Sequence, residues 1–245
     1  MRITALSAVV STAIIIFGAM SAAKAASISF ASDTSWSVTD ASAVPQGNAQ
    51  YVCLNSSSPL NCPIGATSYS FAGNGWSADL SSIPGANWIW ASGITGTTPT
   101  ASLAQYTFSK ELNLLGSPAS GSISVAADDF AKVYVNNNLI GYSGSISDSS
   151  QAAQAQAFLQ TFSITPFLVS GKNIIQVVAQ NGPGIFAGIP GDTNYKQNPS
   201  GVVFGGLVTY EPVTAIPEPT IYPGIFLGIA IFLKLRRHKH IQENV

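Results

Sequence analysis

Residues 105–116 read QYTFSKELNLLG, and this stretch decides the fold class. Its apolar side chains recur at every second position, with one interruption at Lys110: they are Tyr106, Phe108, Leu112 and Leu114. Successive side chains of a β-strand point to opposite faces, so this alternation is typical of a strand with one buried face. The stretch therefore predicts a β-strand that covers a hydrophobic core.

Similar short apolar runs recur along the chain, with Gly, Asn, Ser and Pro between them. They are 27–31, 35–38, 122–126 (SISVA), 133–135 (VYV), 161–164 (TFSI), 174–179 (IIQVVA) and 201–210 (GVVFGGLVTY). Asn136 to Asn138 form a turn signal, because Asn tolerates left-handed backbone. Only 151–159 favours a helix, which we expect in a connection between strands. Residues 26–213 are predicted to form one all-β domain, an antiparallel sandwich or jelly roll with a loop-rich N-terminal region.

Few residues of the chain are charged. The 245 residues include ten Lys and Arg against eleven Asp and Glu, or 9% charged residues, where soluble domains usually have about 25%. Residues 26–213 contain four Lys and nine acidic residues, for a net charge of 4 − 9 = −5. This body lacks the basic surface that a nucleic-acid-binding protein needs. Its aromatic and β-branched residues also exclude a highly charged disordered chain.

Residues 1–25 have the three parts of a secretory signal peptide. Arg2 gives a positive start, an apolar stretch follows, and Ala23-Lys24-Ala25 is a small-x-small cleavage site. We expect a signal helix that is removed, so that the exported chain begins near Ala26. An uncleaved N-terminal anchor is the alternative.

The only two cysteines are Cys53 and Cys62, nine positions apart. In an exported protein such a pair predicts one disulfide that closes a short loop. A metal site is the alternative, but no His, Asp or Glu lies between the two cysteines.

The C-terminal segment 214–245 has three parts in a fixed order. The triplet Pro217-Glu218-Pro219 comes first, and a largely apolar segment predicted as a helix over 221–235 follows. A basic cluster ends it, formed by Lys234, Arg236, Arg237 and Lys239. Its uninterrupted apolar part is short for a hydrocarbon core of about 30 Å, and the basic cluster should stay on the cytoplasmic side. A proline-containing triplet followed by an apolar segment that is short for a membrane anchor indicates a C-terminal signal that an enzyme processes.

This order resembles the PEP-CTERM sorting signal of Gram-negative bacteria over about 25 residues, from Ile216 to Ile241. The resemblance implies a substrate of exosortase, a membrane-embedded processing enzyme, and a link to exopolysaccharide or biofilm matrix. The C-terminal segment departs from the usual PEP-CTERM pattern at Ile216, where Val is commoner. It also has extra residues after the basic cluster. An ordinary single-pass anchor is the alternative.

The body resembles the galactose-binding-domain-like jelly roll over residues 88–210. The motifs that carry this likeness include Trp88-Ile89-Trp90, Asp128-Asp129, Val133-Tyr134-Val135-Asn136, Gly171-Lys172-Asn173 and the closing strand 201–210. Asn137 departs from it, because the turn usually reads Asn-Gly. No sugar-binding signature transfers, because ligand residues in this fold lie in variable loops, so the fold does not assign a ligand.

The residues offer little conventional catalytic chemistry. The only histidines, His238 and His240, lie in the tail, which excludes Ser-His, Cys-His and His-zinc sites from the body. Asp128 and Asp129 are adjacent, so in a strand their side chains should point to opposite faces and fix a turn or loop rather than form an acid pair. Asp192, Asn194 and Asn198 could supply oxygen ligands to calcium but lack the usual acidic density. We therefore expect no catalytic residues, no metal and no cofactor.

The four tryptophans are the candidates for stacking against a ligand. Trp88 and Trp90 are two residues apart and share a face if they lie on a strand, where core packing is the favoured interpretation. Trp36 and Trp76 lie in the polar N-terminal region and are the better surface candidates.

Taken together, the sequence predicts an exported surface or extracellular-matrix protein with a structural or carbohydrate-associated role. Its expected partners are an exosortase-type enzyme, the membrane before processing, and a polysaccharide. The alternatives are a carbohydrate-active enzyme with two loop carboxylates, and a permanently membrane-anchored surface protein.

Overall fold

The computed structural model describes residues 24–54, 62–69, 75–94, 103–183 and 199–213. The signal peptide over 1–25 therefore lies almost wholly outside the described residues. The sorting tail over 214–245, with its helix over 221–235, lies entirely outside them. Within the described residues, no helix has the length and apolarity needed for a membrane span.

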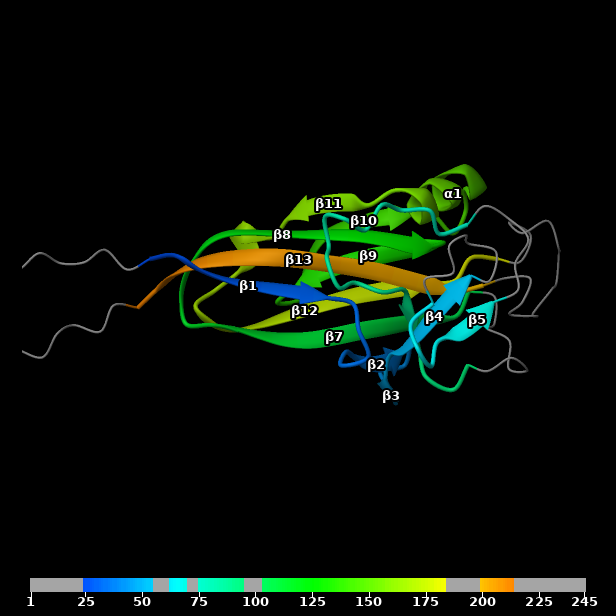
Figure 1. Cartoon of the computed structure of the whole chain (residues 1–245), viewed down its shortest axis with the longest axis horizontal. Coiled ribbons are helices and arrows are strands. Elements are labelled where there is room, and N and C mark those ends of the chain that lie inside the picture. Colours follow the sequence, from blue (N-terminus) through cyan, green and yellow to red (C-terminus); the bar gives the residue numbers. More distant parts are fainter. Residues whose placement is uncertain (1–23, 55–61, 70–74, 95–102, 184–198, 214–245) are drawn as a thin grey trace, which may run out of the picture. The chain divides into compact units, whose positions relative to one another are not determined.

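The described residues form two β-sheets (Figure 1). The first, sheet A, has the order β11-β8-β13-β6-β4-β5, and β1 also pairs with β13. Its strands are β1 (Ala26–Ala31), β4 (Gln50–Leu54), β5 (Thr67–Tyr69), β6 (Ile89–Trp90), β8 (Gly116–Asp128), β11 (Gln160–Ser163) and β13 (Gly201–Pro212). Its pairs are antiparallel except β4 with β5.

The second, sheet B, has the order β10-β9-β12-β7-β2-β3, and all its pairs are antiparallel. Its strands are β2 (Ser37–Asp40), β3 (Pro45–Asn48), β7 (Gln105–Leu114), β9 (Phe130–Val135), β10 (Asn138–Gly144) and β12 (Gly171–Gln180). A mostly antiparallel, two-sheet, all-β architecture is what the sequence predicts.

The core lies between the two sheets and is formed by the alternating apolar positions. Phe108 of β7 is fully buried and lies 6.4 Å from Phe204 of β13, ring centre to ring centre, so the two sheets meet at this contact. On β12 the buried residues Ile175, Val177 and Ala179 alternate with partly exposed ones. This alternation is the period of two that the sequence shows.

Lys110, which interrupts the apolar face of β7, has its own partners. Its ammonium lies 5.5 Å from the centre of the Trp36 ring and 3.8 Å from a carboxylate oxygen of Asp33. It also donates a hydrogen bond of 2.7 Å to Ser35 Oγ. The lysine ammonium therefore lies over the ring of a buried tryptophan and beside a carboxylate.

The N-terminal region contributes strands to both sheets. β1 pairs with the last strand, β13, along six residues, and β2 pairs with β7. The expected strand at 27–31 matches β1 closely, and the one expected at 35–38 overlaps β2 at Ser37 and Val38 only. Both strands are held by main-chain hydrogen bonds to strands that are far away in the sequence, which explains why a region poor in apolar residues is ordered.

The expected helix is α1 (Ser149–Ala157), in the connection between β10 and β11. Asp148 caps its N-terminus by accepting hydrogen bonds from the backbone N–H groups of Ser150 and Gln151. α1 buries Ala152 and Ala155. A 3-10 helix, η1 (Thr165–Phe167), follows β11.

Two amide side chains, one buried and one half-buried, fix the end of the β9–β10 hairpin. Asn173 is fully buried, and its side chain bonds both the N–H and the carbonyl of Val169. Asn136 donates to the Asn173 Oδ1 and to the carbonyl of Phe167, and its Oδ1 accepts the N–H of Ile174. The hairpin turn, β12 and the segment after η1 are thus connected by hydrogen bonds between partly or fully buried groups.

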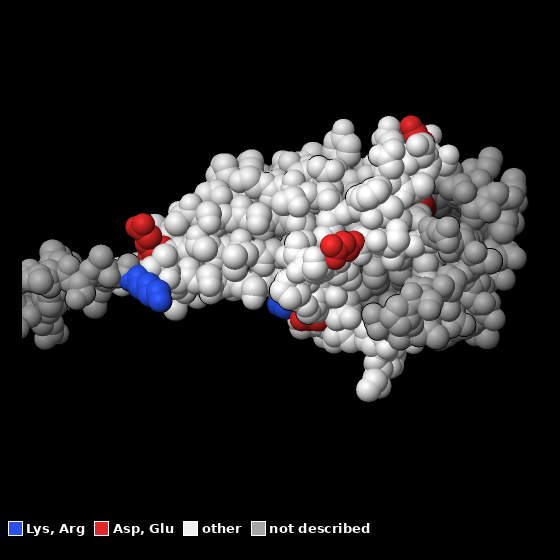
Figure 2. Space-filling view, turned by 45° about the horizontal axis from the view of Figure 1, so that its top comes forward, with Lys and Arg blue, Asp and Glu red and all other residues white. Residues whose placement is uncertain are grey.

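Charged groups are sparse on the surface. Figure 2 shows one face, on which Lys, Arg, Asp and Glu occur singly or in small groups among uncharged residues. One exposed ion pair joins Lys172 to Glu111 at the start of β12.

The turn between β9 and β10 gives a first prediction. Asn136 and Asn137 have φ of 50° and 65°, so both central residues are left-handed, as in a type I′ turn. Asn137→Gly should raise the free energy of unfolding by up to about 1 kcal/mol, because glycine adopts this conformation without a Cβ penalty. Asn137→Ala should lower it by a similar amount. Urea unfolding of both variants measures the two effects, and a destabilising glycine would contradict the assignment.

Candidate functional site

The corner between β8 and β9 brings two acidic side chains together. β8 belongs to sheet A and ends at Asp128, β9 belongs to sheet B and begins at Phe130, and Asp129 lies between them. Both aspartates are 4% exposed, and the peptide bond that joins them is cis. The chain therefore passes from one sheet to the other through two buried carboxyl groups.

Three separate segments donate hydrogen bonds to this pair. Trp76 Nε1 lies 2.8 Å from Asp128 Oδ2, and the backbone N–H of Gly182 lies 2.7 Å from Asp129 Oδ2. Gln156 of α1 donates from one nitrogen, Nε2, to Oδ1 of both aspartates, at 2.7 and 3.2 Å. These donors come from the loop before β6, from the end of β12 and from the helix.

The expectation that the two aspartates point to opposite faces is wrong, because both reach the same Gln156 nitrogen. Strict alternation holds within a regular strand. Here the chain leaves one sheet and enters the other between the two residues, so the alternation does not apply. The expected role, fixing a loop, agrees with the hydrogen bonds.

The electrostatics of the pair follow from its burial. Loss of hydration raises the pKa of Asp128 well above its usual range, and the neighbouring charge of Asp129 adds to the rise. Burial also raises the pKa of Asp129, while the Gly182 N–H opposes the rise. The two carboxyls also hydrogen-bond to each other. The pair thus favours a protonated form in which a hydrogen bond replaces the repulsion between like charges.

The four tryptophans lie in different environments. Trp36 and Trp90 are fully buried. Burial of Trp90 agrees with the core packing favoured for it, whereas the expected surface position of Trp36 is wrong. Trp36 packs edge-on against Phe204 with ring centres 4.6 Å apart and donates to the carbonyl of Ala31. The polar residues around Trp36 suggested a surface position, but β2 lies beside the long strand β7 and places the ring in the core.

Trp76 and Trp88 stack on each other, with ring centres 4.4 Å apart and planes at 13°. Trp88 is 9% exposed and Trp76 is half-buried. Both line a groove of about 350 Å³, together with Val52, Asn87 and the two cysteines. Of the four candidates, these two remain next to a hollow in the surface, although each covers one face of the other.

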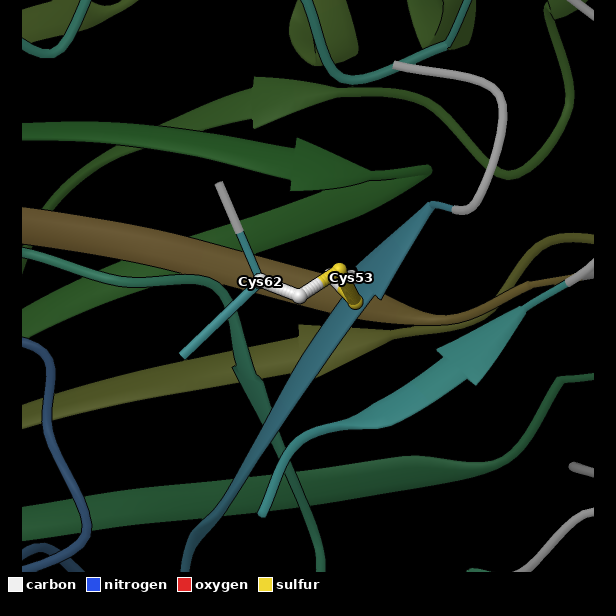
Figure 3. The surroundings of a disulfide bond; sticks show 2 residues. All are labelled: Cys53 and Cys62. Carbon is white, nitrogen blue, oxygen red and sulfur yellow. A yellow bond between two sulfur atoms is a disulfide. The ribbon is translucent and has the colours of Figure 1, made fainter. Parts of the chain in front are cut away.

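Cys53 and Cys62 are joined by a disulfide beside this groove (Figure 3). Cys53 lies in β4, and their Cα atoms are 5.6 Å apart. Cys53 is 8% exposed, so the bond ties residue 62 to a buried position on β4, the strand beside the edge strand β5 of sheet A. No other cysteine is present in the chain.

The remaining acidic candidates have local roles or lie outside the described residues. Asp33 accepts from Ser35, and Asp79 accepts from the N–H of Ser81, which lowers the pKa of the exposed Asp79. The oxygen ligands proposed at Asp192, Asn194 and Asn198 lie outside the described residues, as do the sorting motif and the basic tail: Pro217, Glu218, Pro219, Lys234, Arg236, Arg237 and Lys239. Among the described residues, no three of His, Cys, Asp and Glu form a group that could hold a metal.

Sequence reasoning missed the residue that connects the acidic pair, Gln156. It is one of three glutamines in the helix-prone run QAAQAQAFL. Of the other two, Gln151 contacts Asp148 and Gln154 is exposed. The role of Gln156 depends on where α1 packs against β8 and β10. No local pattern distinguishes it from the others.

No protein-family model and no curated protein matches the chain. Among solved structures, the chain is similar to an α-L-rhamnosidase of Streptomyces avermitilis complexed with L-rhamnose, with 16% identity and a TM-score of 0.39 over 55% of this chain and 12% of that one. An α-L-rhamnosidase of Aspergillus terreus matches with 20% identity and a TM-score of 0.33 over 46% and 14%. A β-glucuronidase of Bacteroides uniformis matches with 20% identity and a TM-score of 0.28 over 42% and 12%.

This chain spans 12% to 14% of the length of these three enzymes. The likenesses are partial and have TM-scores below 0.5. The functional conclusion therefore depends on the chain's own residues.

The acidic pair gives a second prediction, on pH. Because both carboxyls have a raised pKa in the folded state, the stability that they contribute is fully present below their ordinary pKa of 3.8 and is lost as the pH rises through the folded-state value. Their contribution to the free energy of unfolding should therefore decrease between about pH 4 and pH 7. Asp129→Asn should weaken the dependence of the free energy of unfolding on pH. The asparagine amide N–H can donate to Asp128 in place of the proton of the carboxyl pair, and its amide oxygen can still accept from the Gly182 N–H.

Urea unfolding across this pH range compares the variant with the wild type. Glu211→Gln, at an exposed carboxyl on β13, should keep the wild-type dependence. Identical pH dependence in wild type and Asp129→Asn would contradict the role of the pair.

The shared donor gives a third prediction. Gln156→Ala should lower the free energy of unfolding by about 1–3 kcal/mol, because two buried carboxyl groups lose a hydrogen bond. Gln154→Ala is the matched control on the exposed side of the same helix and should change stability by less than about 0.5 kcal/mol. Equal effects of the two substitutions would contradict the assignment.

Proposed function

We propose that this chain is an exported, non-catalytic β-sandwich protein of the cell surface or extracellular matrix of a Gram-negative bacterium. In this proposal an exosortase-type enzyme processes its C-terminal tail after transit through the inner membrane. The observation that carries the proposal is the order of three signals in the tail: the triplet Pro217-Glu218-Pro219, the apolar segment 221–235 and the basic cluster. A signal peptide over 1–25 supplies the matching export signal.

The Cys53–Cys62 disulfide supports the proposed export. Disulfides persist in oxidising compartments, and cytoplasmic thiols are kept reduced. The bond joins Cys53 of β4 to Cys62, nine positions later in the chain. An exported domain can retain such a bond after folding.

The environment of the acidic pair supports a non-catalytic role. Asp128 and Asp129 are the two carboxyls that converge in the described residues, and both are buried. Their oxygens accept from Trp76, Gln156 and Gly182. A glycosidase needs two carboxyls on either side of a substrate bond, about 5–10 Å apart. This pair instead connects parts of the fold.

The galactose-binding-like assignment of the sandwich belongs to the same proposal. The motifs that carry this resemblance lie at turns and strand ends: Asp128-Asp129 at the corner between the sheets, Asn136 at the hairpin and Asn173 near the start of β12.

Fractionation of the native cells with intact-mass measurement gives the fourth prediction. The released protein should begin near Ala26, lack residues after the Pro-Glu-Pro triplet and contain two fewer hydrogens than the reduced chain. Replacement of Pro217 and Pro219 by Ala should keep the full tail on the protein and retain it in the membrane fraction. Pro212→Ala, a proline substitution outside the triplet, should be processed normally.

Two outcomes would contradict this proposal. Peptides from 221–245 in the released protein would exclude removal of the tail. A chain that keeps residues 1–25 and stays in the cytoplasm would exclude export.

A further inference from the structure

The outer face of sheet B has a side-chain composition of its own at β9, β10 and β12. On β9, Ala131, Val133 and Val135 are buried in the core, so the alternating residues Phe130, Lys132 and Tyr134 point outward. The three strands lie side by side in the order β10-β9-β12 (Figure 1). We call the surface formed by Phe130, Lys132, Tyr134, Tyr142, Gln176 and Gln180 the outer aromatic face.

The strand register brings these six residues next to one another. Tyr134 pairs with Gln176, and Phe130 pairs with Gln180 across β9 and β12. Lys132 pairs with Tyr142 across β9 and β10. Residues directly opposite each other in an antiparallel pair project from the same face, with Cβ atoms about 5 Å apart. The ring centres of Phe130 and Tyr142 lie 6.2 Å apart.

Several hydrogen-bonding groups of this face have no partner among the described residues. The hydroxyls of Tyr134 and Tyr142 make no hydrogen bond to the described chain, and Tyr142 is 62% exposed. Gln176 donates from Nε2 to Ser109, and Gln180 donates from Nε2 to the carbonyl of Leu103. No donor of the described chain reaches the amide oxygens of these two glutamines. The face thus offers apolar ring surface next to donors and acceptors that are available to a ligand.

The charge of the face is low. Lys132 is its single charged residue, and its ammonium lies 5.6 Å from the centre of the Phe130 ring. At the border of the face, Lys172 and Glu111 neutralise each other in an ion pair. An acidic polymer or a phosphate-rich surface would need a cluster of cations. A ligand with many neutral hydroxyl groups and apolar C–H faces matches the side chains that are present.

We propose that the outer aromatic face binds a neutral polysaccharide chain, with Tyr134 and Tyr142 packing against sugar rings and Gln176 and Gln180 accepting hydrogen bonds from sugar hydroxyls. This inference rests on the proposed carbohydrate-associated role and gives it a ligand class and a surface. An open sheet face suits a long polymer, because a polymer can cross several strands without entering a pocket. Binding to such a shallow surface is expected to depend on a few central rings.

Affinity electrophoresis of the released protein tests this inference and is the fifth prediction. Each native gel contains one polymer. Three of the polymers are neutral, namely galactomannan, xyloglucan and dextran, and the fourth, alginate, is acidic. At least one neutral polymer should retard the wild type, and alginate should retard it less. The double variant Tyr134→Ala, Tyr142→Ala should lose about tenfold or more in affinity, since it removes two central contacts.

Two matched controls separate this face from general exposure of apolar groups. Phe158→Ala removes an exposed aromatic ring at the end of α1, and Leu207→Ala removes an exposed apolar side chain from the outer face of sheet A. Both should bind like the wild type. Gln176→Ala with Gln180→Ala should weaken binding and leave both tyrosines in place. Thermal unfolding confirms that each variant is folded.

The remaining outcomes overturn the inference. They are retardation by none of the neutral polymers, stronger retardation by alginate, and equal loss of binding in the Phe158 control. Self-association that the tyrosine substitutions abolish, without glycan binding, would assign the face to a second copy of the chain. The intact mass of the same preparation separates the two proposals: a correctly processed protein that binds no neutral polymer contradicts only the glycan-binding face.

Discussion

The hydrogen-bonded pair Asp128–Asp129 is the constraint on which the arrangement of the two sheets depends. It lies at the corner where the chain leaves β8 and enters β9, and it accepts hydrogen bonds from the loop before β6, from α1 and from the end of β12. Two buried carboxyls are costly unless they are hydrogen-bonded or protonated. The three donating segments therefore have to be in place together, which couples distant parts of the chain.

A second set of hydrogen-bonded polar groups, formed by the half-buried Asn136 and the buried Asn173, lies at the hairpin. Asn136 and Asn173 bond each other and the backbone of three segments. The corner and the hairpin mark the two ends of β9, so its direction and register are fixed at both ends. The outer side chains of β9 are therefore held in a constant relation to those of β10 and β12. This rigidity is what a shallow binding face on these strands requires.

Local patterns in the sequence predicted much of the fold, and for physical reasons. The alternation in 105–116 and 174–179 predicted strands because burial on one face imposes a period of two. The run 151–159 predicted α1 through its helix propensity, and the Asn-rich turn predicted the β9–β10 hairpin. The prediction was wrong where contacts are non-local. Trp36 lies among polar residues but is buried by β13, and Asp128 and Asp129 converge because the chain changes sheets between them.

The sequence by itself determined the long core strands and the hairpin turn, because each depends on the residues of one short segment, and its composition determined the sparse charge. It did not predict β3, β4 and β5, which lie in the region expected to be loop-rich. The two terminal segments also contain the proposed export and sorting signals, and each of these is likewise read from its own local sequence. Only the tertiary structure decided which of three similar glutamines serves the acidic pair, which tryptophans are buried, and which side chains meet on the outer face of sheet B. These depend on strand order and register, which hydrogen bonds between residues far apart in the chain establish.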